Sequence, residues 1–275
     1  MRAARAFLFL ATLAATFCAG GPSQALDLTS LYTTRAIVTG TEKTNRKPGF
    51  EDCFRKVLVK VSGDPNLPGD PAVEAALPQA ASFIRDFRYR DRMEDVPIHD
   101  EQGTYDRPHD LTCTFDRARI DAFLEKIGRK PWLAERPRIM VFLAVKQVAR
   151  SFVVARNSGD GNYMRQSLAA AGEPLALPVE LPDAATLSSA ALNANTLPKV
   201  ELADLDAIAA RYDGALALTG VLTWSEEERG WIADWRIGHD GKVYEWKQRG
   251  VSFDEAFRKA MAGTLQVLSG NGQPR

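Results

Sequence analysis

The chain has 275 residues, and its 35 lysine and arginine residues are balanced by 35 aspartate and glutamate residues. This balance excludes the basic surplus that nucleic-acid-binding domains and polybasic membrane-surface patches carry. The length suits two domains of modest size.

The N-terminus has the three parts of a secretory signal peptide. Arg2 and Arg5 precede the apolar run Ala6–Phe17, and Ser23-Gln24-Ala25 has the small-x-small form of a cleavage site. The run is too short to span a membrane as a helix. We therefore expect residues 1–25 to be a signal peptide that is cleaved after Ala25.

Cys18 raises the alternative of a lipoprotein anchor. Phe17 precedes it directly, whereas lipoprotein processing requires a small residue at that position, so lipidation at Cys18 is disfavoured. No later run approaches the ~20 apolar residues that a transmembrane helix needs. The expected location is therefore the periplasm.

A first domain is predicted over residues 26–129. Dense β-branching makes Leu31–Gly40 a strand. A helix follows, because apolar residues then recur at helical spacing. They are Phe50, Cys53, Phe54, Val57, Leu58 and Val61. Asp70 and Pro71 open a second helix, which Pro78 must kink or split.

The same domain continues with two strands and a further helix. Phe87–Met93 is predicted as a strand, and the polar segment Glu94–His109 as a long exposed hairpin loop. The returning strand alternates apolar residues with threonine. Its apolar residues are Leu111, Cys113 and Phe115. Asp116 caps a helix that Gly128 ends, and the order β-α-α-β-β-α predicts helices on one face of a small antiparallel sheet.

Residues 130–138 are a proline-containing linker, and residues 139–270 form the predicted second domain. Its longest apolar run, Ile139–Val145, indicates a central strand that is covered on both faces. A short helix over Tyr163–Gly172 and a strand over Leu175–Val179 follow.

Asp183–Val200 lacks a convincing period and is predicted to be a mobile surface loop. A helix over Leu202–Tyr212 leads into a strand meander. Ser252, with Glu255 three residues later, opens the final helix as a capping box. Residues 271–275 are expected to be a disordered tail.

Leu216–Arg249 predicts a three-stranded antiparallel meander with a defined register. Asp240-Gly241 is a dipeptide typical of type I′ turns, and folding about it places Trp235 opposite Trp246. The preceding turn places Gly220 opposite Trp235. The resulting row of tryptophans could form a platform for a sugar or aromatic ligand. Packing under helices is favoured, because charged pairs occupy the opposite face. The predicted fold class is α+β, with two small domains, each a mainly antiparallel sheet packed with helices.

Several sequence blocks resemble a family of exported proteobacterial proteins that share a domain of unknown function. The blocks are Leu31-Tyr32, Val57–Gly63, Trp132, Arg136-Pro137, Leu175–Pro182 and Ala209–Gly220. This resemblance implies an exported protein and brings no catalytic residues. A fainter likeness connects Leu202–Leu268 with the N-terminal domain of the Tol-system propeller protein and with curli-secretion lipoproteins. That second likeness concerns the fold, which does not fix function.

No group of residues predicts a catalytic, cofactor or metal site. His99 and His109 are each followed by aspartate, but they lack a recognised ligand spacing, so a solvated loop is favoured. Asn157–Asn162 lacks the lysine of a phosphate loop and the spaced acids of a calcium loop. His239 beside Asp240 is better explained as part of the hairpin turn.

Cys53 and Cys113 are both predicted on buried faces of the first domain. An oxidising periplasm favours a disulfide between them, provided that their Cα atoms lie within reach. Two unpaired core cysteines are the alternative.

Three functions are compatible with these patterns. The leading hypothesis is a non-enzymatic interaction or assembly module of the Gram-negative envelope, with an envelope protein as its partner. The alternative is a binding protein for a glycan fragment or lipid, held in an inter-domain cleft with apolar walls. The third is an unrecognised hydrolase, which would need clustered titratable groups.

Overall fold

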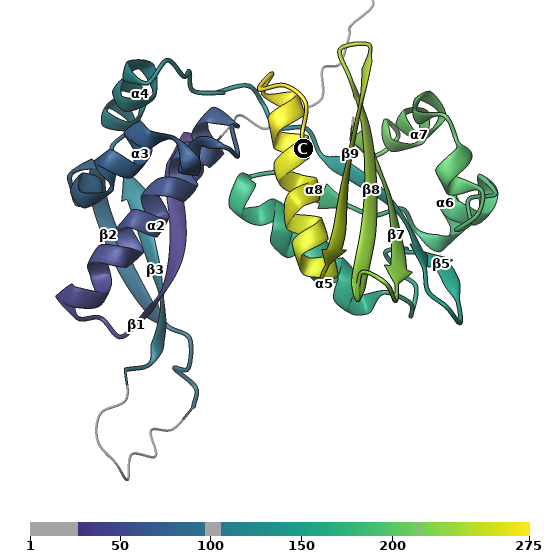
Figure 1. Cartoon of the computed structure of the whole chain (residues 1–275), viewed down its shortest axis with the longest axis horizontal. Helices are drawn as coiled ribbons and strands as arrows, with labels where there is room; N and C mark the ends of the chain where they lie inside the picture. Colours follow the sequence, from purple (N-terminus) through teal and green to yellow (C-terminus); the bar gives the residue numbers. More distant parts are fainter. Residues whose placement is uncertain (1–26, 97–105, 214) are drawn as a thin grey trace, which may run out of the picture.

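The computed structural model describes residues 27–96, 106–213 and 215–275. The predicted signal peptide, Cys18, the cleavage site after Ala25, and His99 lie outside these residues. The described chain forms two lobes, each a sheet with helices, which confirms the α+β class (Figure 1). No helix among the described residues is both long and apolar enough to cross a membrane.

The first domain is a three-stranded antiparallel sheet with the strand order β1-β3-β2. Its strands are β1 (Thr33–Thr39), β2 (Ile84–Asp91) and β3 (Pro108–Phe115). Helix α2 (Lys43–Ser62) packs on one face, where Ala36, Leu111 and Cys113 join the core. Alternate residues of β1 are buried and exposed, so the second face of the sheet lacks this apolar cover.

Short helical segments complete the described part of the first domain. They are α1 (Leu28–Leu31), η1 (Leu67–Gly69), α3 (Pro71–Ala76), η2 (Leu77–Phe83) and α4 (Arg117–Lys126). The Asp70 and Asp116 side chains cap α3 and α4 as predicted, and the chain changes from α3 to η2 just before Pro78. Gly63 ends α2 in the left-handed conformation, with φ of 75°.

The second domain is a mixed sheet with the strand order β5-β4-β7-β8-β9, and β6 also pairs with β4. Its strands are β4 (Ile139–Lys146), β5 (Ser151–Val153), β6 (Val179–Glu180), β7 (Leu216–Ser225), β8 (Gly230–His239) and β9 (Lys242–Val251). The pairings of β4 with β6 and β7 are parallel, and the other three are antiparallel.

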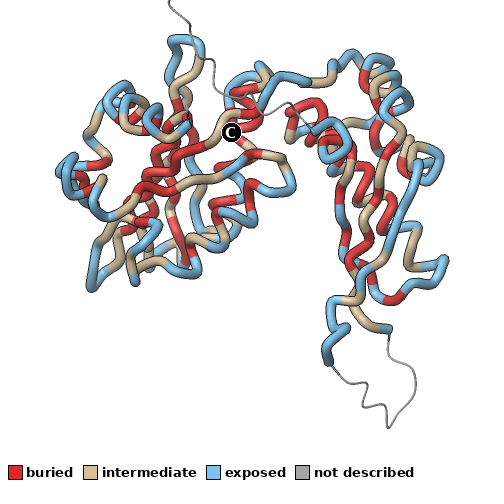
Figure 2. Tube along the Cα trace, turned by 180° about the vertical axis from the view of Figure 1, so that it is seen from behind, coloured by how far each residue is buried: buried red, intermediate tan, exposed pale blue. Residues whose placement is uncertain are grey.

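Helices cover both faces of β4, as its unbroken apolar sequence predicted. The second-domain helices are α5 (Asn162–Gly172), η3 (Glu173–Leu175), α6 (Ala184–Ser189), η4 (Leu197–Lys199), α7 (Leu202–Ala209) and α8 (Phe253–Leu268). Alternate residues of β4 pack with α5 and α8 on one face and with α6, η4 and α7 on the other. Figure 2 shows buried chain running through the middle of this lobe.

The meander has the predicted register. Trp235 pairs with Trp246 and with Gly220 on its other side, and the turn residues Asp240 and Gly241 have φ of 48° and 71°. Trp235 and Trp246 are buried in the core shared with α8. The prediction that the tryptophans pack under a helix is therefore confirmed, and the alternative of an exposed ligand platform is wrong.

Four local predictions require correction. Asp183–Val200 forms α6, η4 and connecting turns, because Leu187, Leu192 and Leu197 are buried against the sheet despite their irregular spacing. The expected strand at Leu175–Val179 is reduced to β6 and preceded by the 3-10 turn η3. Strand β2 begins at Ile84 instead of Phe87, and β3 already includes His109.

Residues near the end of the described chain make hydrogen bonds to both domains. Asn271 donates from Nδ2 to the Ser62 carbonyl at 3.0 Å, and Ser269 donates from Oγ to the Gly63 carbonyl at 3.0 Å. Gln273 donates to the Glu245 carbonyl at 2.6 Å. The bonds of Ser269 and Asn271 hold the end of α8 against the C-terminal end of α2, whereas the Gln273 bond reaches β9.

Candidate functional site

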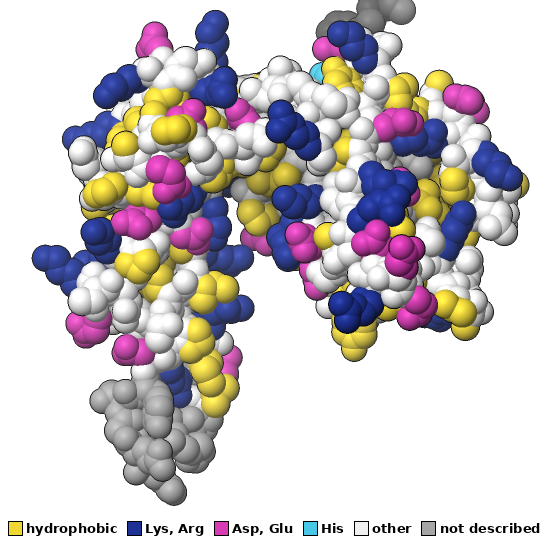
Figure 3. Space-filling view, viewed as in Figure 1, with side chains coloured by type: hydrophobic (Ala, Val, Ile, Leu, Met, Phe, Trp, Pro, Cys, Tyr) yellow, Lys and Arg dark blue, Asp and Glu magenta, His cyan; other side chains and the backbone are white. Residues whose placement is uncertain are grey.

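A cavity of about 820 Å³ lies between the uncovered face of the first sheet and the second domain. Its walls come from β1, β2, β3 and α2 on one side. The second domain contributes Glu173 and Pro174 of η3 on the other. Figure 3 shows Lys and Arg side chains gathered along the side of the first domain that faces the second.

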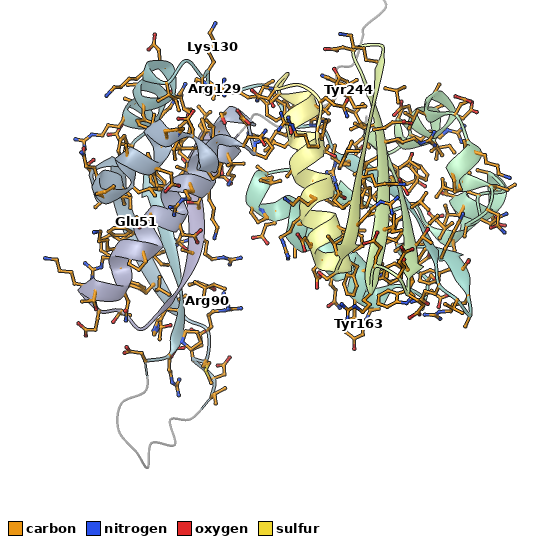
Figure 4. All side chains as sticks on the ribbon, viewed as in Figure 1. Glu51, Arg90, Arg129, Lys130, Tyr163 and Tyr244 are labelled. Carbon is orange, nitrogen blue, oxygen red and sulfur yellow. The ribbon has the colours of Figure 1, made fainter. Side chains whose placement is uncertain are left out.

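The cross-strand register arranges the sheet side of this cavity in rows. Arg35 of β1 and Arg88 of β2 lie on either side of Thr112 of β3. In the next row, Arg90 lies beside Asp110. Figure 4 labels Arg90 near the end of the sheet. Residues with the same facing recur every second position along a strand, so these side chains all face the cavity.

Positive charge predominates in the cavity lining, which holds six lysine and arginine residues and four carboxylates. Asp110 is buried and lies 3.9 Å from Arg35 and 3.6 Å from Arg92. No carboxylate of the described chain lies within ion-pair distance of Arg88 or Arg90. The two arginines therefore present uncompensated charge on an exposed strand.

Lys60 lies at the inner end of the cavity and is 6% exposed. Its Nζ donates to the carbonyls of Ser30 at 2.7 Å and Thr33 at 3.1 Å. Burial, reinforced by the neighbouring Arg136 guanidinium, lowers the pKa of Lys60 to about 8. A buried ammonium that is bonded to neutral carbonyls keeps most of its charge uncompensated.

Arg136 connects Lys60 of the first domain to Leu175 of the second domain through hydrogen bonds. Its Nη2 donates to the Lys60 carbonyl at 2.6 Å and its Nη1 to the Leu175 carbonyl at 3.0 Å, while the guanidinium stacks on Trp132 at 4.4 Å. Burial lowers the pKa of Arg136 to about 10. Among the described residues, its buried Nε has no hydrogen-bond partner. Arg136 therefore holds η3, and with it Glu173, beside α2.

The lowered pKa of Lys60 predicts a pH-dependent stability. In the unfolded chain this lysine has the ordinary lysine pKa of about 10.5. Above pH 8 the folded chain releases the proton first, so the unfolded chain binds more protons and stability rises with pH. The unfolding free energy should increase by about 2 kcal/mol between about pH 8 and pH 9.5.

Urea unfolding at several pH values checks this, with Lys60→Met as the variant that should lose the slope. The range ends below pH 10 because burial and the Asp121 hydrogen bond raise the pKa of Tyr32, which makes stability fall again at higher pH. A slope that persists in the variant would contradict the assignment to Lys60.

The second domain holds a cavity of about 730 Å³ on the sheet face opposite α8. It is lined by the predicted cross-strand charge pairs, and Lys247 lies 2.8 Å from Asp234. Arg236 of this lining donates to the Val200 carbonyl at 3.2 Å.

The described histidines, His109 and His239, line neither cavity. His109 lies on β3 of the first domain, with Nδ1 2.8 Å from the Arg107 carbonyl, whereas His239 lies at the end of β8 and 3.5 Å from Asp240. No group of three potential metal ligands occurs among the described residues. Asn157–Asn162 leads into α5, and Arg150 contacts its Asp160 at 3.0 Å.

Cys53 and Cys113 come together as the helix and strand assignments predicted. Both are buried free thiols, and Cys53 Sγ lies 3.7 Å from the Leu111 carbonyl oxygen. A hydrogen bond between the two thiols lowers the pKa of Cys53.

Sequence reasoning missed the arginines of the cavity. Arg88, Arg90 and Arg92 alternate along β2 and its end, which is a readable signal for one cationic strand face. Glu173 carried no comparable signal, because its position depends on how the two domains meet.

Residues 25–133 match the family described as Domain of unknown function (DUF8605). This match covers the first domain and every residue that lines the inter-domain cavity except Glu173 and Pro174. No curated protein matches the chain. No solved structure matches it either.

Proposed function

We propose that the chain is an exported, non-enzymatic binding protein that holds an anionic ligand of the Gram-negative envelope in its inter-domain cavity. The excess of cations in the cavity, with Arg88 and Arg90 lacking carboxylate partners in the described chain, carries this proposal. The cavity position agrees with the ligand-binding alternative of the sequence analysis. Its walls differ, because arginine and threonine replace the expected apolar lining.

Export to the periplasm is part of the proposal and rests on the signal-peptide pattern of residues 1–25 and on the resemblance to exported proteobacterial proteins. The non-enzymatic character is supported by the cavity chemistry. Its charged groups are guanidinium and ammonium groups and four carboxylates, of which Asp110 and Glu173 lie in ion pairs. His109 and His239, which a hydrolase could have used together, lie in different domains.

Retention on immobilised heparin, a polyanion, tests the cationic cavity. The variant Arg88→Glu with Arg90→Glu should elute at clearly lower salt than the unchanged chain, because two cations of the cavity become anions. The matched control is Arg258→Glu with Lys259→Glu, which makes the same charge change on exposed residues of α8. Equal loss of retention in both variants would contradict a specific cavity site.

A second candidate function is the envelope assembly module, and strand β9 favours it. Strand β9 ends the sheet, and no described strand pairs with its outer edge, although Gln273 occupies the Glu245 carbonyl. Val243 is 60% exposed near the tip of the hairpin that rises from the lobe in Figure 1. An edge of this kind can receive a strand from a partner.

Cross-linking in intact cells tests this candidate, because Lys242 and Lys247 lie on β9 itself. Reproducible cross-links from these lysines to one envelope protein would support an assembly role. Cross-links that are absent under several growth conditions would count against it and leave the ligand-binding proposal unaffected.

A further inference from the structure

We propose that the ligand is a phosphorylated sugar or polyol, whose phosphate monoester binds between Arg35 and Arg88 over Thr112 and displaces Glu173. This inference rests on the proposed function and specifies the ligand class of the same cavity. It is carried by the strand register, the charge of the lining and the contact that Glu173 makes across the cavity.

The pairing of β1 and β2 with β3 places Arg35 and Arg88 at a spacing that suits one oxyanion group. Arg35 and Arg88 lie on strands that flank β3, so their Cα atoms are about 10 Å apart. Two guanidinium groups can reach toward each other over Thr112, and each can donate two parallel hydrogen bonds to a phosphate. The Thr112 hydroxyl, for which the described chain shows no hydrogen bond, lies on the floor between them.

The charge of the lining favours a dianion over a monoanion. Lys56 pairs with Asp52 at 2.6 Å, and Arg35 and Arg92 lie near Asp110. Arg88 and Arg90 remain as an excess of two exposed cations without a carboxylate partner in the described chain. A phosphate monoester carries nearly two negative charges at neutral pH, because its second pKa is about 6. A single carboxylate would leave half of the excess uncompensated.

The polarity of the lining favours a sugar or polyol over a lipid as the source of the phosphate. Threonines of β1, β3 and α1 line the cavity together with Asp27 and Asp86, and these groups suit the hydroxyls of a sugar. Its apolar side chains include Ile37 and Pro174, which are too few to cover an acyl chain.

Glu173 currently takes the place that the ligand phosphate would occupy. Its Oε1 lies 3.7 Å from Arg35 Nη2, and the two side chains are 71% and 51% exposed. An ion pair this open to water is weak and can be displaced. Because Arg136 fixes η3 beside α2, the Glu173 carboxylate stays close to Arg35 and competes with any incoming anion.

Titration calorimetry of the purified chain with glucose 1-phosphate, glucuronate and vesicles containing phosphatidic acid tests the ligand class. Glucose 1-phosphate should bind at least about tenfold more tightly than glucuronate, and Arg35→Gln or Arg88→Gln should each weaken it about tenfold. Its affinity should fall from pH 7 to pH 5 as the phosphate gains a proton. Vesicle binding in place of sugar-phosphate binding would overturn the inference, as would equal affinity for glucuronate.

Glu173→Gln tests the internal competitor and should raise the affinity for glucose 1-phosphate about threefold. Glu227→Gln is the matched control, because Glu227 is an exposed glutamate of the same domain at the β7–β8 turn. Unchanged or weaker binding by Glu173→Gln would refute the competition. If glucose 1-phosphate fails to bind while heparin retention still depends on Arg88 and Arg90, this inference is wrong and the proposed function stands. If neither signal appears, both are wrong.

Discussion

Replacing Gly220 by alanine is expected to lower the free energy of unfolding of the second domain by about 3 kcal/mol or more. A Cβ atom at this position would lie 2.2 Å from Cζ3 of Trp235 and 2.9 Å from Cδ1 of Leu143. Both neighbours are fully buried side chains in the core between the sheet and α8. Neither can move without disturbing its own packing, so overpacking cannot be relieved locally.

Urea unfolding followed by tryptophan fluorescence measures this effect. Gly159→Ala is the matched control, because no atom lies within 4 Å of a Cβ built at Gly159. That variant should change the unfolding free energy by less than about 1 kcal/mol. A Gly220→Ala variant as stable as the control would show that Trp235 does not lie over bare backbone.

The second large effect concerns Cys53 and Cys113, which we propose form a disulfide when the chain folds in an oxidising compartment. The Cys53 thiol lies against β1 and β3, 3.9 Å from the Thr34 carbonyl, and Cys113 is the direct strand partner of Thr34. Reduction should then cost the first domain about 4 kcal/mol of stability, because the bond closes a loop of roughly 60 residues.

The two cysteines are oxidised by thiol–disulfide exchange, in which the disulfide of an oxidant is reduced. The Cys53 thiolate attacks the disulfide of the oxidant, which forms a mixed disulfide and frees one thiolate of the oxidant. The Cys113 thiolate then displaces the oxidant, which leaves as a dithiol with both electrons. Because both cysteines are fully buried in the folded domain, the exchange precedes the completion of folding.

Thiol counting on denatured, unreduced protein decides whether the bond forms. Two free thiols from Cys53 and Cys113 would refute it. In the Cys113→Ala variant, the unfolding midpoint should no longer respond to reductant, which separates the bond from general effects of reduction.

The parts of the fold that the sequence predicted well depend on local periodicity. The meander register follows from side chains that alternate about Asp240-Gly241, and the structure places Trp235 opposite Trp246. The start of α8 was also predicted from a local pattern, the capping box of Ser252 and Glu255. In the structure the Ser252 hydroxyl accepts a hydrogen bond from the Glu255 amide at 3.1 Å, as this motif requires.

The parts that could not be predicted depend on contacts between distant segments. Leu187 and Leu197 lie in the short helices α6 and η4, which are buried against the sheet and are too short to show a helical period. The alternation of arginines along β2 is a signal for an exposed cationic face that the sequence analysis did not use. The cavity itself exists because Arg136 bonds to Lys60, which brings Glu173 toward Arg35.

The hydrogen bonds that Ser269 and Asn271 make to Gly63 and Ser62 have a consequence for the order of assembly. These partners are separated by more than 200 residues of sequence. Domains fold as units as the chain emerges, the N-terminal one first. The end of α2 therefore stays without these partners until the second domain has been synthesised and α8 has formed. During this interval Gly63 and the first-domain wall of the cavity are accessible to chaperones and proteases. The docking of α8 ends that interval.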